Sequence, residues 1–412
     1  MPALDVTASP EEVGLDPARL DRIVEHFDRY VADGLLPGYV VSVSRGGEVA
    51  WVASSGMADI ERAVPMSASH RFRIYSMTKP IVSIAAMMLV ERGLLRLNDP
   101  IAPIIDAFHT PSVLVGGTED APEVVPSPEP IRLWHLLSHT SGMTYGFQYN
   151  HLSDALYRKA GFEWGWPAGI DLAEACRLLE QLPLRFTPGT GWNYGMSTDI
   201  LGRVLEVVVG KPLDEVLDEM VLTPLGMHET GFSVPVDDVG SVAQLYGPDA
   251  TQGGKAVAID FLALPPAERP SLLSGGGGLY STPYDYARFT RMLVNGGELD
   301  GVRLIGPRTL EHMVRNHLPG GVDLEQLAED MFSETSYCGV GFGLGFSVVI
   351  DEAAHKVPVT EGSFSWGGAA STIFWVDPIE ALEVSFFTQL LPSGTYPLRE
   401  ELSALVYAAI VD

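Results

Sequence analysis

Apolar residues near the start of the chain recur at helical spacing and would form one face of a helix. They are Leu20, Ile23, Val24, Phe27 and Val31. Asp16-Pro17 is a helix start signal and Gly34 a stop signal, so a helix is expected between them. Strand-like runs follow at 39–44 and 49–53 around a turn at 45–47, which predicts a β-hairpin.

The middle and the end of the chain have different patterns. From about residue 99 to 273, helical patterns alternate with Pro- and Gly-rich loops, and no strand is expected. The helical runs are 171–182, 196–209 and 213–221, and the irregular connectors are 122–130 and 265–270. Strand-like segments return at 343–350, 370–376 and 382–389, before a closing helical pattern at 397–411.

Together these patterns predict an α/β (α+β) fold with two lobes. Residues 1–98 and 274–412 would form one lobe, in which the N- and C-terminal helices flank a sheet. Residues 99–273 would form an inserted, mostly helical lobe. Clefts between such lobes are favoured binding sites, so the active site is expected there.

The composition narrows the classes of function. The chain has 412 residues, 46% of them hydrophobic, and a formal net charge of −27. Such an acidic chain is not expected to bind nucleic acid or anionic membrane surfaces. No apolar stretch reaches the roughly 20 residues that span a bilayer, and residues 1–13 lack a secretory signal pattern, so a cytoplasmic protein is expected. Cys176 and Cys338 lie far apart without metal-type spacing and are expected to be buried, reduced thiols.

Ser76 and Lys79 place a hydroxyl and an amine three positions apart, just before the apolar run 81–95. Positions i and i+3 of a helix share a face, so the two side chains can meet. Pro80 suits a first helical turn, where the partial positive charge of the helix end favours a lowered pKa for the Lys79 amine. The pattern fits a serine nucleophile with a lysine base. It also fits a serine N-cap beside a solvated lysine, and these residues alone leave both open.

Two further segments carry groups that can act in a reaction. Tyr194 lies in a glycine-containing loop before an apolar helix, where a tyrosine can relay protons to a lysine or simply pack. Trp366-Gly367-Gly368 leads into an apolar strand. Backbone N–H groups there can stabilise an oxyanion, or the glycines can form a bulge beside a buried tryptophan. For both segments the residues alone favour the structural explanation.

No metal and no cofactor are expected. His135 and His139 have i, i+4 spacing, but no H-E-x-x-H glutamate and no evident third ligand accompany them. The glycine run 275–278 matches neither a dinucleotide motif nor a P-loop, and it predicts a flexible turn. The aromatic side chains within 145–166 form either a wall for an apolar ligand or ordinary packing inside the lobe.

In combination, these motifs make the chain similar to the serine β-lactamase-like superfamily, and within it to the family VIII carboxylesterases. The matching segments are 72–79 with Ser76 and Lys79, the L-L-x-H-T-S-G turn at 136–142, Tyr194 with 199–202, the glycine-rich 275–285, and Trp366-Gly367-Gly368. Their order and rough spacing across most of the chain are specific. The resemblance implies an antiparallel sheet with an inserted helical lobe, as in β-lactamases and penicillin-binding proteins.

The resemblance also implies roles for individual residues. Ser76 would be the nucleophile that forms an acyl-enzyme, and Lys79 and Tyr194 would share the general-base work. The backbone N–H groups of Ser76 and Ala369 would form the oxyanion hole. The substrate site would be lined by Trp366, Gly367 and Gly368, and Tyr75, directly before the nucleophile, would shape that site or pack.

Two departures from the family pattern favour an esterase over a β-lactamase. Class C enzymes carry Y-x-N, whereas Met196 is the third residue here. They also carry K-T-G where this chain has Trp366-Gly367-Gly368. The cation that holds an anionic β-lactam is therefore lost, while a neutral ester would lose little.

The expected function is thus hydrolysis of short-chain carboxylic esters, with a small-molecule ester as the partner. The alternatives are a β-lactamase- or D,D-peptidase-like hydrolase, an acyltransferase on the same fold, or a non-catalytic binding protein. The sequence indicates neither the natural substrate nor the oligomeric state.

Overall fold

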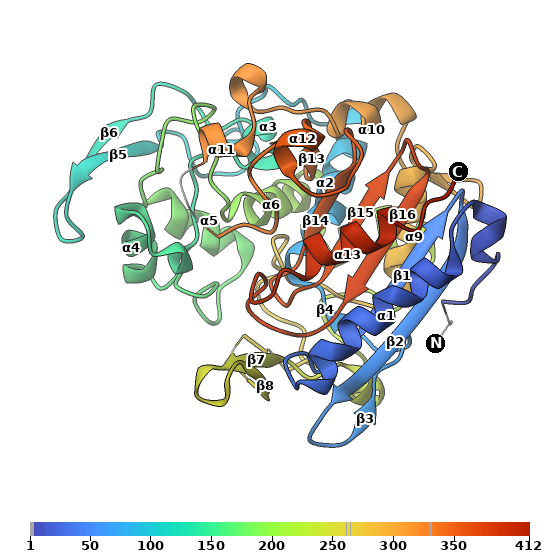
Figure 1. The fold of residues 1–412 in the computed structure, drawn as a ribbon. Helices are drawn as coiled ribbons and strands as arrows, with labels where there is room; N and C mark the ends of the chain where they lie inside the picture. Colours follow the sequence, from blue (N-terminus) through green and yellow to red (C-terminus); the bar gives the residue numbers. More distant parts are fainter. Residues whose placement is uncertain (1–3, 261, 264, 329–331) are drawn as a thin grey trace.

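The computed structural model describes residues 4–260, 262–263, 265–328 and 332–412 (Figure 1). Within these residues, eight strands form one antiparallel sheet in the order β12-β13-β14-β15-β16-β1-β2-β3. The strands are β1 (Gly38–Arg45), β2 (Glu48–Asp59), β3 (Val64–Pro65), β12 (Val340–Phe342), β13 (Ser347–Val349), β14 (Phe364–Gly367), β15 (Ile373–Asp377) and β16 (Leu382–Phe387). The predicted fold class is confirmed.

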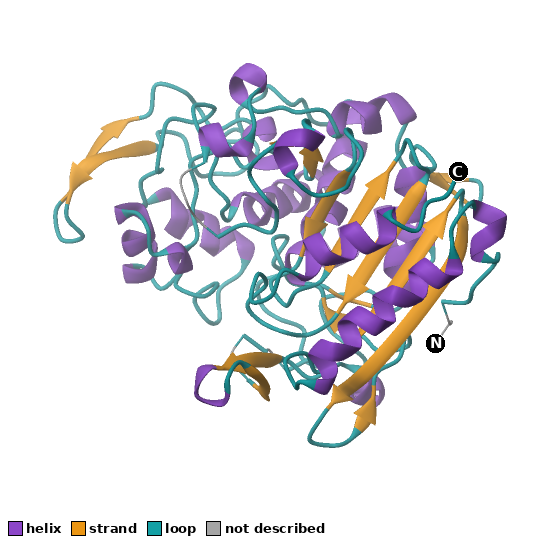
Figure 2. Cartoon of the chain, viewed as in Figure 1, coloured by secondary structure: helices purple, strands orange, loops and turns teal. Residues whose placement is uncertain are grey.

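Strands from opposite ends of the sequence meet at the centre of the sheet. Strand β1 pairs with its hairpin neighbour β2 on one side and with β16 on the other, where Val40 lies opposite Phe387. The residues of β1 from Gly38 to Ser44 are buried, which fits a strand rich in β-branched and aromatic side chains. Figure 2 shows the sheet with helices on both faces.

Helices α1 (Pro17–Ala32) and α13 (Leu398–Tyr407), both expected from the sequence, cover one face of the sheet. The Asp16 carboxylate caps α1 by accepting the Ala18 N–H at 2.9 Å. Gly34 follows the helix with a φ of 71°, the left-handed conformation that favours glycine. The apolar stripes of the two helices pack on alternate residues of β1, β15 and β16.

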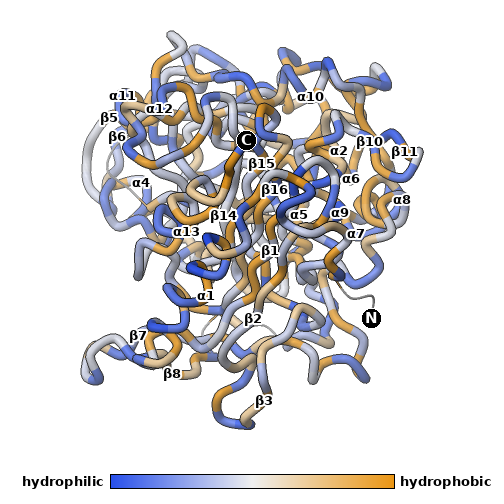
Figure 3. Tube along the Cα trace, turned by 45° about the vertical axis from the view of Figure 1, so that its right-hand side comes forward, coloured by the Kyte–Doolittle hydropathy of each residue, from blue (hydrophilic) through white to orange (hydrophobic). Residues whose placement is uncertain are grey.

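The opposite face carries α2 (Thr78–Glu91) and α9 (Pro283–Val294). Helix α2 is buried from Thr78 to Leu89, because the sheet and α6 (Ser197–Val209) enclose it. Figure 3 shows that hydrophobic stretches gather along the central strands. One hydrophobic core joins α2, α6 and α9 to this face of the sheet.

The remaining elements surround these layers. The other α-helices are α3 (Leu133–Leu137), α4 (Leu152–Lys159), α5 (Leu172–Glu180), α7 (Leu213–Leu217), α8 (Thr223–Leu225), α10 (Pro307–Met313), α11 (Leu324–Leu327) and α12 (Glu352–His355). Short antiparallel pairs join β4 (Phe72–Arg73) to β9 (Tyr280–Ser281), β5 (Ser112–Gly117) to β6 (Pro122–Pro126), β7 (Tyr246–Asp249) to β8 (Lys255–Ala258), and β10 (Glu298–Leu299) to β11 (Val302–Arg303). None of the helices among the described residues is both long and apolar enough to cross a membrane.

Several predicted elements are wrong. The connector expected at 122–130 contains β6, because an exposed edge strand tolerates proline at its ends. Of the strand expected at 343–350, only β13 at 347–349 is present, because the residues before it turn the chain back from β12, with a φ of 101° at Gly345. The helix expected over 213–221 is interrupted by a π-helical turn at Asp218–Leu222.

Two other expectations also change. Trp366 and Gly367, expected to lead into a strand, belong themselves to strand β14, and a turn separates them from β15. Both cysteines are free thiols and Cys176 is buried, but Cys338 is partly exposed. The division into residues 1–98 with 274–412 and residues 99–273 stays a prediction, as does the expected cytoplasmic location. Residues 1–3 of the segment without a signal pattern lie outside the described residues.

Candidate active site

Ser76 lies in η2 (Tyr75–Met77), a 3₁₀ turn that runs directly into α2. Its side chain makes no helix-capping hydrogen bond, and Lys79 is only 2% exposed, so the alternative of a serine cap beside a solvated lysine is wrong. The preceding Tyr75 has a φ of 43°, a strained conformation that persists only where the surroundings enforce it. The Tyr75 hydroxyl donates to the Leu262 carbonyl oxygen at 3.4 Å, so this ring is held against residues of a neighbouring loop.

Oxygen atoms surround the Lys79 amine. Its Nζ lies 3.2 Å from Ser76 Oγ and 2.8 Å from Tyr194 Oη. It also lies 2.7 Å from the carbonyl oxygen of Gly276. Tyr194 Oη in turn lies 2.5 Å from Ser76 Oγ, so the hydroxyl of Ser76 contacts both other groups. The structure thus brings together the three side chains that the motifs singled out.

Burial determines which of these groups titrates near neutral pH. It lowers the pKa of Lys79 to about 8, although the negative charges of Asp199 and Glu334 oppose the shift. Burial, reinforced by the charge of Glu334, raises the pKa of Tyr194 well above its usual 10. Tyr194 is therefore a neutral phenol, and Lys79 is the group that can lose a proton near neutrality.

The glycine run 275–278 forms a turn that is held in place. The buried Asp199 carboxylate accepts the Gly276 N–H at 3.0 Å and the Ser274 hydroxyl at 2.5 Å. A Cβ on Gly276 would lie 2.4 Å from Asp199 Oδ2, so the close approach requires glycine. Since the Gly276 carbonyl accepts from Lys79, Asp199 positions an acceptor of the lysine. The expectation of a flexible turn missed this contact.

The Trp366-Gly367-Gly368 segment lies beside the nucleophile. The Trp366 ring packs on Tyr194 at 5.3 Å between centroids, nearly edge to face. The end of β14 lies against the segment before Ser76. The approach is so close that a Cβ on Gly368 would lie 2.4 Å from the Ile74 carbonyl oxygen. The register of β14 with β15 is regular, so the glycines serve this close approach and form no bulge.

The half-buried Ala369 follows in the turn between β14 and β15. Neither its backbone N–H nor that of Ser76 has a hydrogen-bond acceptor among the residues that the structure describes. Two N–H groups near the nucleophile are therefore available to a ligand oxygen.

Tyr145 is a site residue that the sequence analysis did not single out. Its Oη lies 3.1 Å from Lys79 Nζ, and its ring meets Tyr194 at 5.3 Å. Burial raises the pKa of Tyr145 well above its usual value, so it is also a neutral phenol. In the sequence, Tyr145 is only one of several aromatic residues in its segment, and nothing distinguishes it from Phe147. In the structure the two rings stack with 4.8 Å between their centroids.

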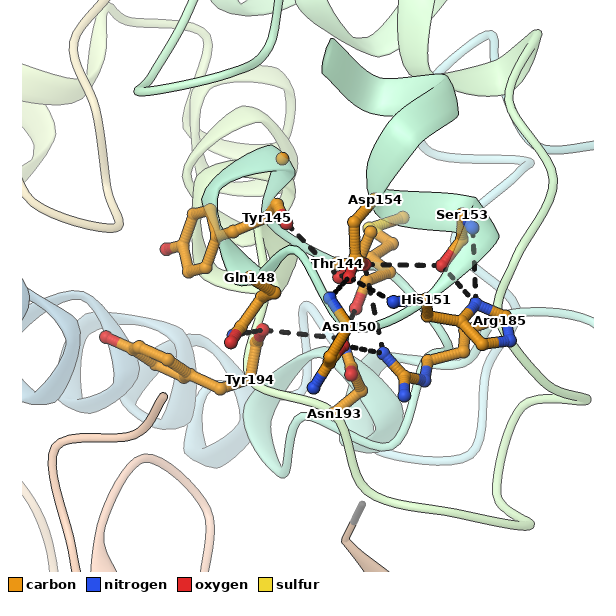
Figure 4. A network of polar contacts seen from close by, with 12 residues as sticks. Thr144, Tyr145, Gln148, Asn150, His151, Ser153, Asp154, Arg185, Asn193 and Tyr194 are labelled. Atoms are coloured by element: carbon orange, nitrogen blue, oxygen red, sulfur yellow. Dashed lines mark hydrogen bonds and ion pairs between the residues drawn. The ribbon is translucent and has the colours of Figure 1, made fainter. Parts of the chain in front are cut away.

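A buried polar network holds the loop that carries Tyr145 (Figure 4). The Asp154 carboxylate accepts the Thr144 hydroxyl at 2.7 Å and the His151 N–H at 2.9 Å. Gln148 donates to the Tyr194 carbonyl oxygen at 3.2 Å, which ties this loop to the segment of the second tyrosine. Both phenols are thus positioned by backbone and side-chain contacts.

The histidines have structural contacts. His135 Nδ1 accepts the Arg132 N–H at 3.0 Å at the start of α3. His139 is buried, with its ring 5.0 Å from Tyr194. Elsewhere, Asp323, Glu325 and Cys338 bring possible ligand atoms within 4.8 Å of one another at the surface, where acidic groups often gather without an ion.

Comparisons with known proteins show what the chain as a whole is similar to. The sequence profile of the protein family described as "Beta-lactamase" matches residues 23–408. Esterase EstB of Burkholderia gladioli is 32% identical over 422 residues, covering 98% of this chain and 99% of that protein. Lovastatin esterase of Penicillium rubens is 31% identical over 320 residues, covering 73% and 75%. The solved structure of EstCE1, described as a hydrolase with promiscuous acyltransferase activity, superposes with a TM-score of 0.79 at 28% identity, covering 96% and 99% of the two chains.

Proposed function

Since this chain belongs to the beta-lactamase family, we propose that it is a serine hydrolase of carboxylic esters, within the family VIII carboxylesterases, with Ser76 as the nucleophile. The observation that carries the proposal is the position of Ser76 Oγ, within hydrogen-bonding distance of both Lys79 Nζ and Tyr194 Oη. A hydroxyl beside a buried amine of lowered pKa is the arrangement of an activated nucleophile.

In acylation, Ser76 Oγ attacks the ester carbonyl carbon and its proton passes to the neutral Lys79 amine, directly or through Tyr194. The N–H groups of Ser76 and Ala369 donate to the oxygen on which negative charge develops. The ester C–O bond then breaks, and the departing alkoxide takes a proton from Lys79 through the Tyr194 hydroxyl. An acyl group remains on Ser76.

Deacylation uses the same groups in reverse. A water molecule attacks the acyl carbon while Lys79 accepts its proton, and Ser76 Oγ regains a proton as the C–O bond to the enzyme breaks. The neutral state of Tyr194 suits it to relay protons in both half-reactions. Gly276, through its carbonyl oxygen, keeps the Lys79 amine at Ser76 throughout.

Trp366 supports an ester substrate over an anionic β-lactam. It occupies the place where the resemblance puts the K-T-G lysine, and its ring packs on Tyr194. No cation at this position compensates a substrate carboxylate. EstB and lovastatin esterase are both described as esterases. A preference for short acyl chains is part of the proposal, because Ser76 is only 8% exposed.

The test is turnover of p-nitrophenyl acetate, butyrate and octanoate, beside a chromogenic cephalosporin, by wild type and Ser76→Ala. We expect ester cleavage to fall by a factor of about 10³ or more in the variant while folding is kept. Ser83→Ala is the matched control, because Ser83 is a buried serine of α2, the helix that follows the turn carrying Ser76. Retained ester turnover in Ser76→Ala would refute the proposal. Cleavage of the cephalosporin faster than of the esters would show that the enzyme is a β-lactamase instead.

Acyl transfer is the second candidate, and the burial of Ser76 and Lys79 favours it because burial restricts water at the acyl-enzyme. EstCE1 is described with this side activity. Product analysis with added butan-1-ol separates the two reactions. Butyl ester formed at the expense of free acid would indicate a transferase, and free acid alone a hydrolase.

A further inference from the structure

Arg399, at the start of α13, contacts the turn that carries Ala369. Its Nη2 donates to the carbonyl oxygens of Gly368 at 3.3 Å and Thr372 at 3.2 Å, which lie on either side of that turn. A Cβ on Gly367 would overlap the guanidinium, so the end of β14 lies directly against it. Arg399 therefore holds both ends of the turn to α13.

The contact with Gly368 determines the direction of one N–H group. The Gly368 carbonyl and the Ala369 N–H belong to the same peptide unit, which is planar and trans, so they point in opposite directions. Since the Gly368 oxygen is directed at Arg399, the Ala369 N–H points away from the guanidinium. This N–H has no acceptor among the described residues, and it is the second oxyanion donor of the proposed function.

The turn lies between Arg399 and the segment before the nucleophile. Successive residues of a strand face opposite sides of the sheet. Gly367 accordingly meets Arg399, and Gly368 meets the carbonyl oxygen of Ile74. A displacement of Arg399 would therefore move the Ala369 N–H relative to the nucleophile.

Glu334 and Ser393 hold the guanidinium in this orientation. Arg399 Nη2 lies 2.7 Å from Glu334 Oε2, and its Nη1 donates to the Glu334 carbonyl oxygen at 2.5 Å. The Ser393 hydroxyl donates to Glu334 Oε2 at 3.0 Å, and the Ser393 N–H donates to the Ala369 carbonyl oxygen at 2.7 Å. The Glu334 side chain is fully buried. This cluster thus holds both peptide groups of Ala369.

We propose that Arg399 is a positioning residue of the oxyanion hole, oriented by Glu334 and Ser393, and that it directs and polarises the Ala369 N–H. Hydrogen bonds in a chain strengthen one another, so the guanidinium on the Gly368 carbonyl makes this N–H a better donor. The inference rests on the proposed function, which requires that donor. Because the negative charge develops only during attack, losing the contact should lower kcat and kcat/KM together.

Arg399→Met tests the contact, because methionine keeps a flexible apolar side chain and has no hydrogen-bond donor. With p-nitrophenyl butyrate we expect kcat to fall about tenfold or more while KM changes little, since removal of a whole oxyanion donor costs about 10²–10³. An unchanged kcat would overturn the proposal.

A double variant separates positioning from stability. Arg399→Met leaves the buried Glu334 carboxylate without its cation, which is destabilising by itself. Arg399→Met/Glu334→Gln removes both charges, so its thermal unfolding midpoint should return towards that of wild type while kcat stays reduced. Recovery of kcat together with stability would show that Arg399 serves the fold alone and would overturn the proposal.

The thionoester analogue of p-nitrophenyl butyrate reports on the oxyanion hole itself. Its sulfur is larger than oxygen and a weaker hydrogen-bond acceptor, so well-placed donors favour the oxygen ester. The ratio of kcat/KM for the oxygen ester to that for the thionoester should fall severalfold in both Arg399 variants. An unchanged ratio in both would overturn the proposal, whatever their stability.

Arg45→Met/Glu380→Gln is the matched control. Arg45 Nη2 lies 2.7 Å from Glu380 Oε2, and Arg45 also donates to backbone carbonyl oxygens, so the two ion pairs are alike. Through β16, Arg45 aligns with Asp377 at the end of β15, whereas the Ala369 turn precedes the start of that strand. The control should keep the wild-type ratio, with kcat within about twofold.

The dependence of turnover on Ser76 separates this inference from the proposed function. Wild-type turnover that Ser76→Ala abolishes, with a reduced ratio in the Arg399 variants alone, is the expected result. If wild type and Ser76→Ala cleave the ester equally, or neither does, the proposed function fails and the inference with it. If turnover depends on Ser76 but the Arg399 variants behave as the Arg45 control does, only the inference fails.

Discussion

Lys79 experiences two opposed influences, and their balance determines the pH at which the site works. Burial disfavours the ammonium form, whereas the charges of Asp199 and Glu334 favour it. Burial dominates, which leaves the pKa at about 8. The buried Asp199 also contacts the turn that accepts from Lys79, so charge and position are coupled.

The pH dependence of kcat/KM follows from this balance. A general base must be neutral, so activity should fall about tenfold per pH unit below the Lys79 pKa of about 8 and reach a plateau above it. Removing the Asp199 charge in Asp199→Asn should move the inflection to lower pH. An inflection near the ordinary lysine value of 10.5, measured on p-nitrophenyl acetate, would contradict this.

The two phenols should differ in importance because only Tyr194 contacts both Ser76 and Lys79. Tyr194→Phe should lower kcat by a factor of about 10²–10⁴, the usual contribution of a proton-transfer group. Tyr145→Phe removes one hydrogen bond to Lys79 and should cost about fivefold to tenfold. Steady-state kinetics of both variants tests the order, and equal losses would contradict it.

At the scale of elements, the glycine turn and the start of α6 act as one unit. Asp199 of α6 holds Gly276, and Gly276 holds Lys79 of α2. These contacts join segments far apart in the sequence. Packing of α2 against α6 sets the distance between them.

Neighbouring glycines of this turn provide a matched pair of variants. In Gly276→Ala the new Cβ would lie 2.4 Å from Asp199 Oδ2, so the turn must move and kcat/KM should fall about tenfold or more. In Gly277→Ala the nearest atom would lie 3.6 Å away, an ordinary contact, so kcat/KM should stay within about twofold. Ester turnover and circular dichroism check both. Equal effects would show that Gly276 is not selectively constrained.

Local sequence patterns correctly predicted the elements that have a clear apolar spacing or clear turn residues. The periodic helices α1, α6 and α13 and the hairpin of β1 and β2 follow from apolar spacing and turn residues. The pair β5 and β6 was missed because proline normally argues against a strand, and its exposed edge is known only in three dimensions. The strand expected over 343–350 was too long at its start, because the spacing alone does not reveal that Gly345 turns the chain.

The same limit applies to the site. Ser76 and Lys79 could be paired from the sequence because they share one helical turn, and Tyr194 joined them only through the order of motifs. Nothing local distinguishes Tyr145 from the aromatic residues around it, since its contact with Lys79 depends on how separate segments pack. The hydrogen bond between Asp199 and Gly276 could not be predicted for the same reason.

At the scale of the whole molecule, the net charge of −27 should select among esters by their charge. A negative field repels an anionic substrate, and salt screens it: the screening length falls from ~30 Å at ~0.01 M to ~10 Å at ~0.1 M. Over this range kcat/KM for a p-nitrophenyl hemisuccinate should rise severalfold, while that for p-nitrophenyl butyrate should stay constant. A parallel response of both substrates would rule out steering by charge.

The pairing of β1 with β16 also has a consequence for biosynthesis. Val40 emerges from the ribosome long before Phe387, its partner in the sheet. At about 5–20 residues per second, the wait is on the order of tens of seconds. Throughout that time the apolar strand β1 lacks one neighbour, so the nascent chain offers a binding segment to ribosome-associated chaperones until translation is nearly complete.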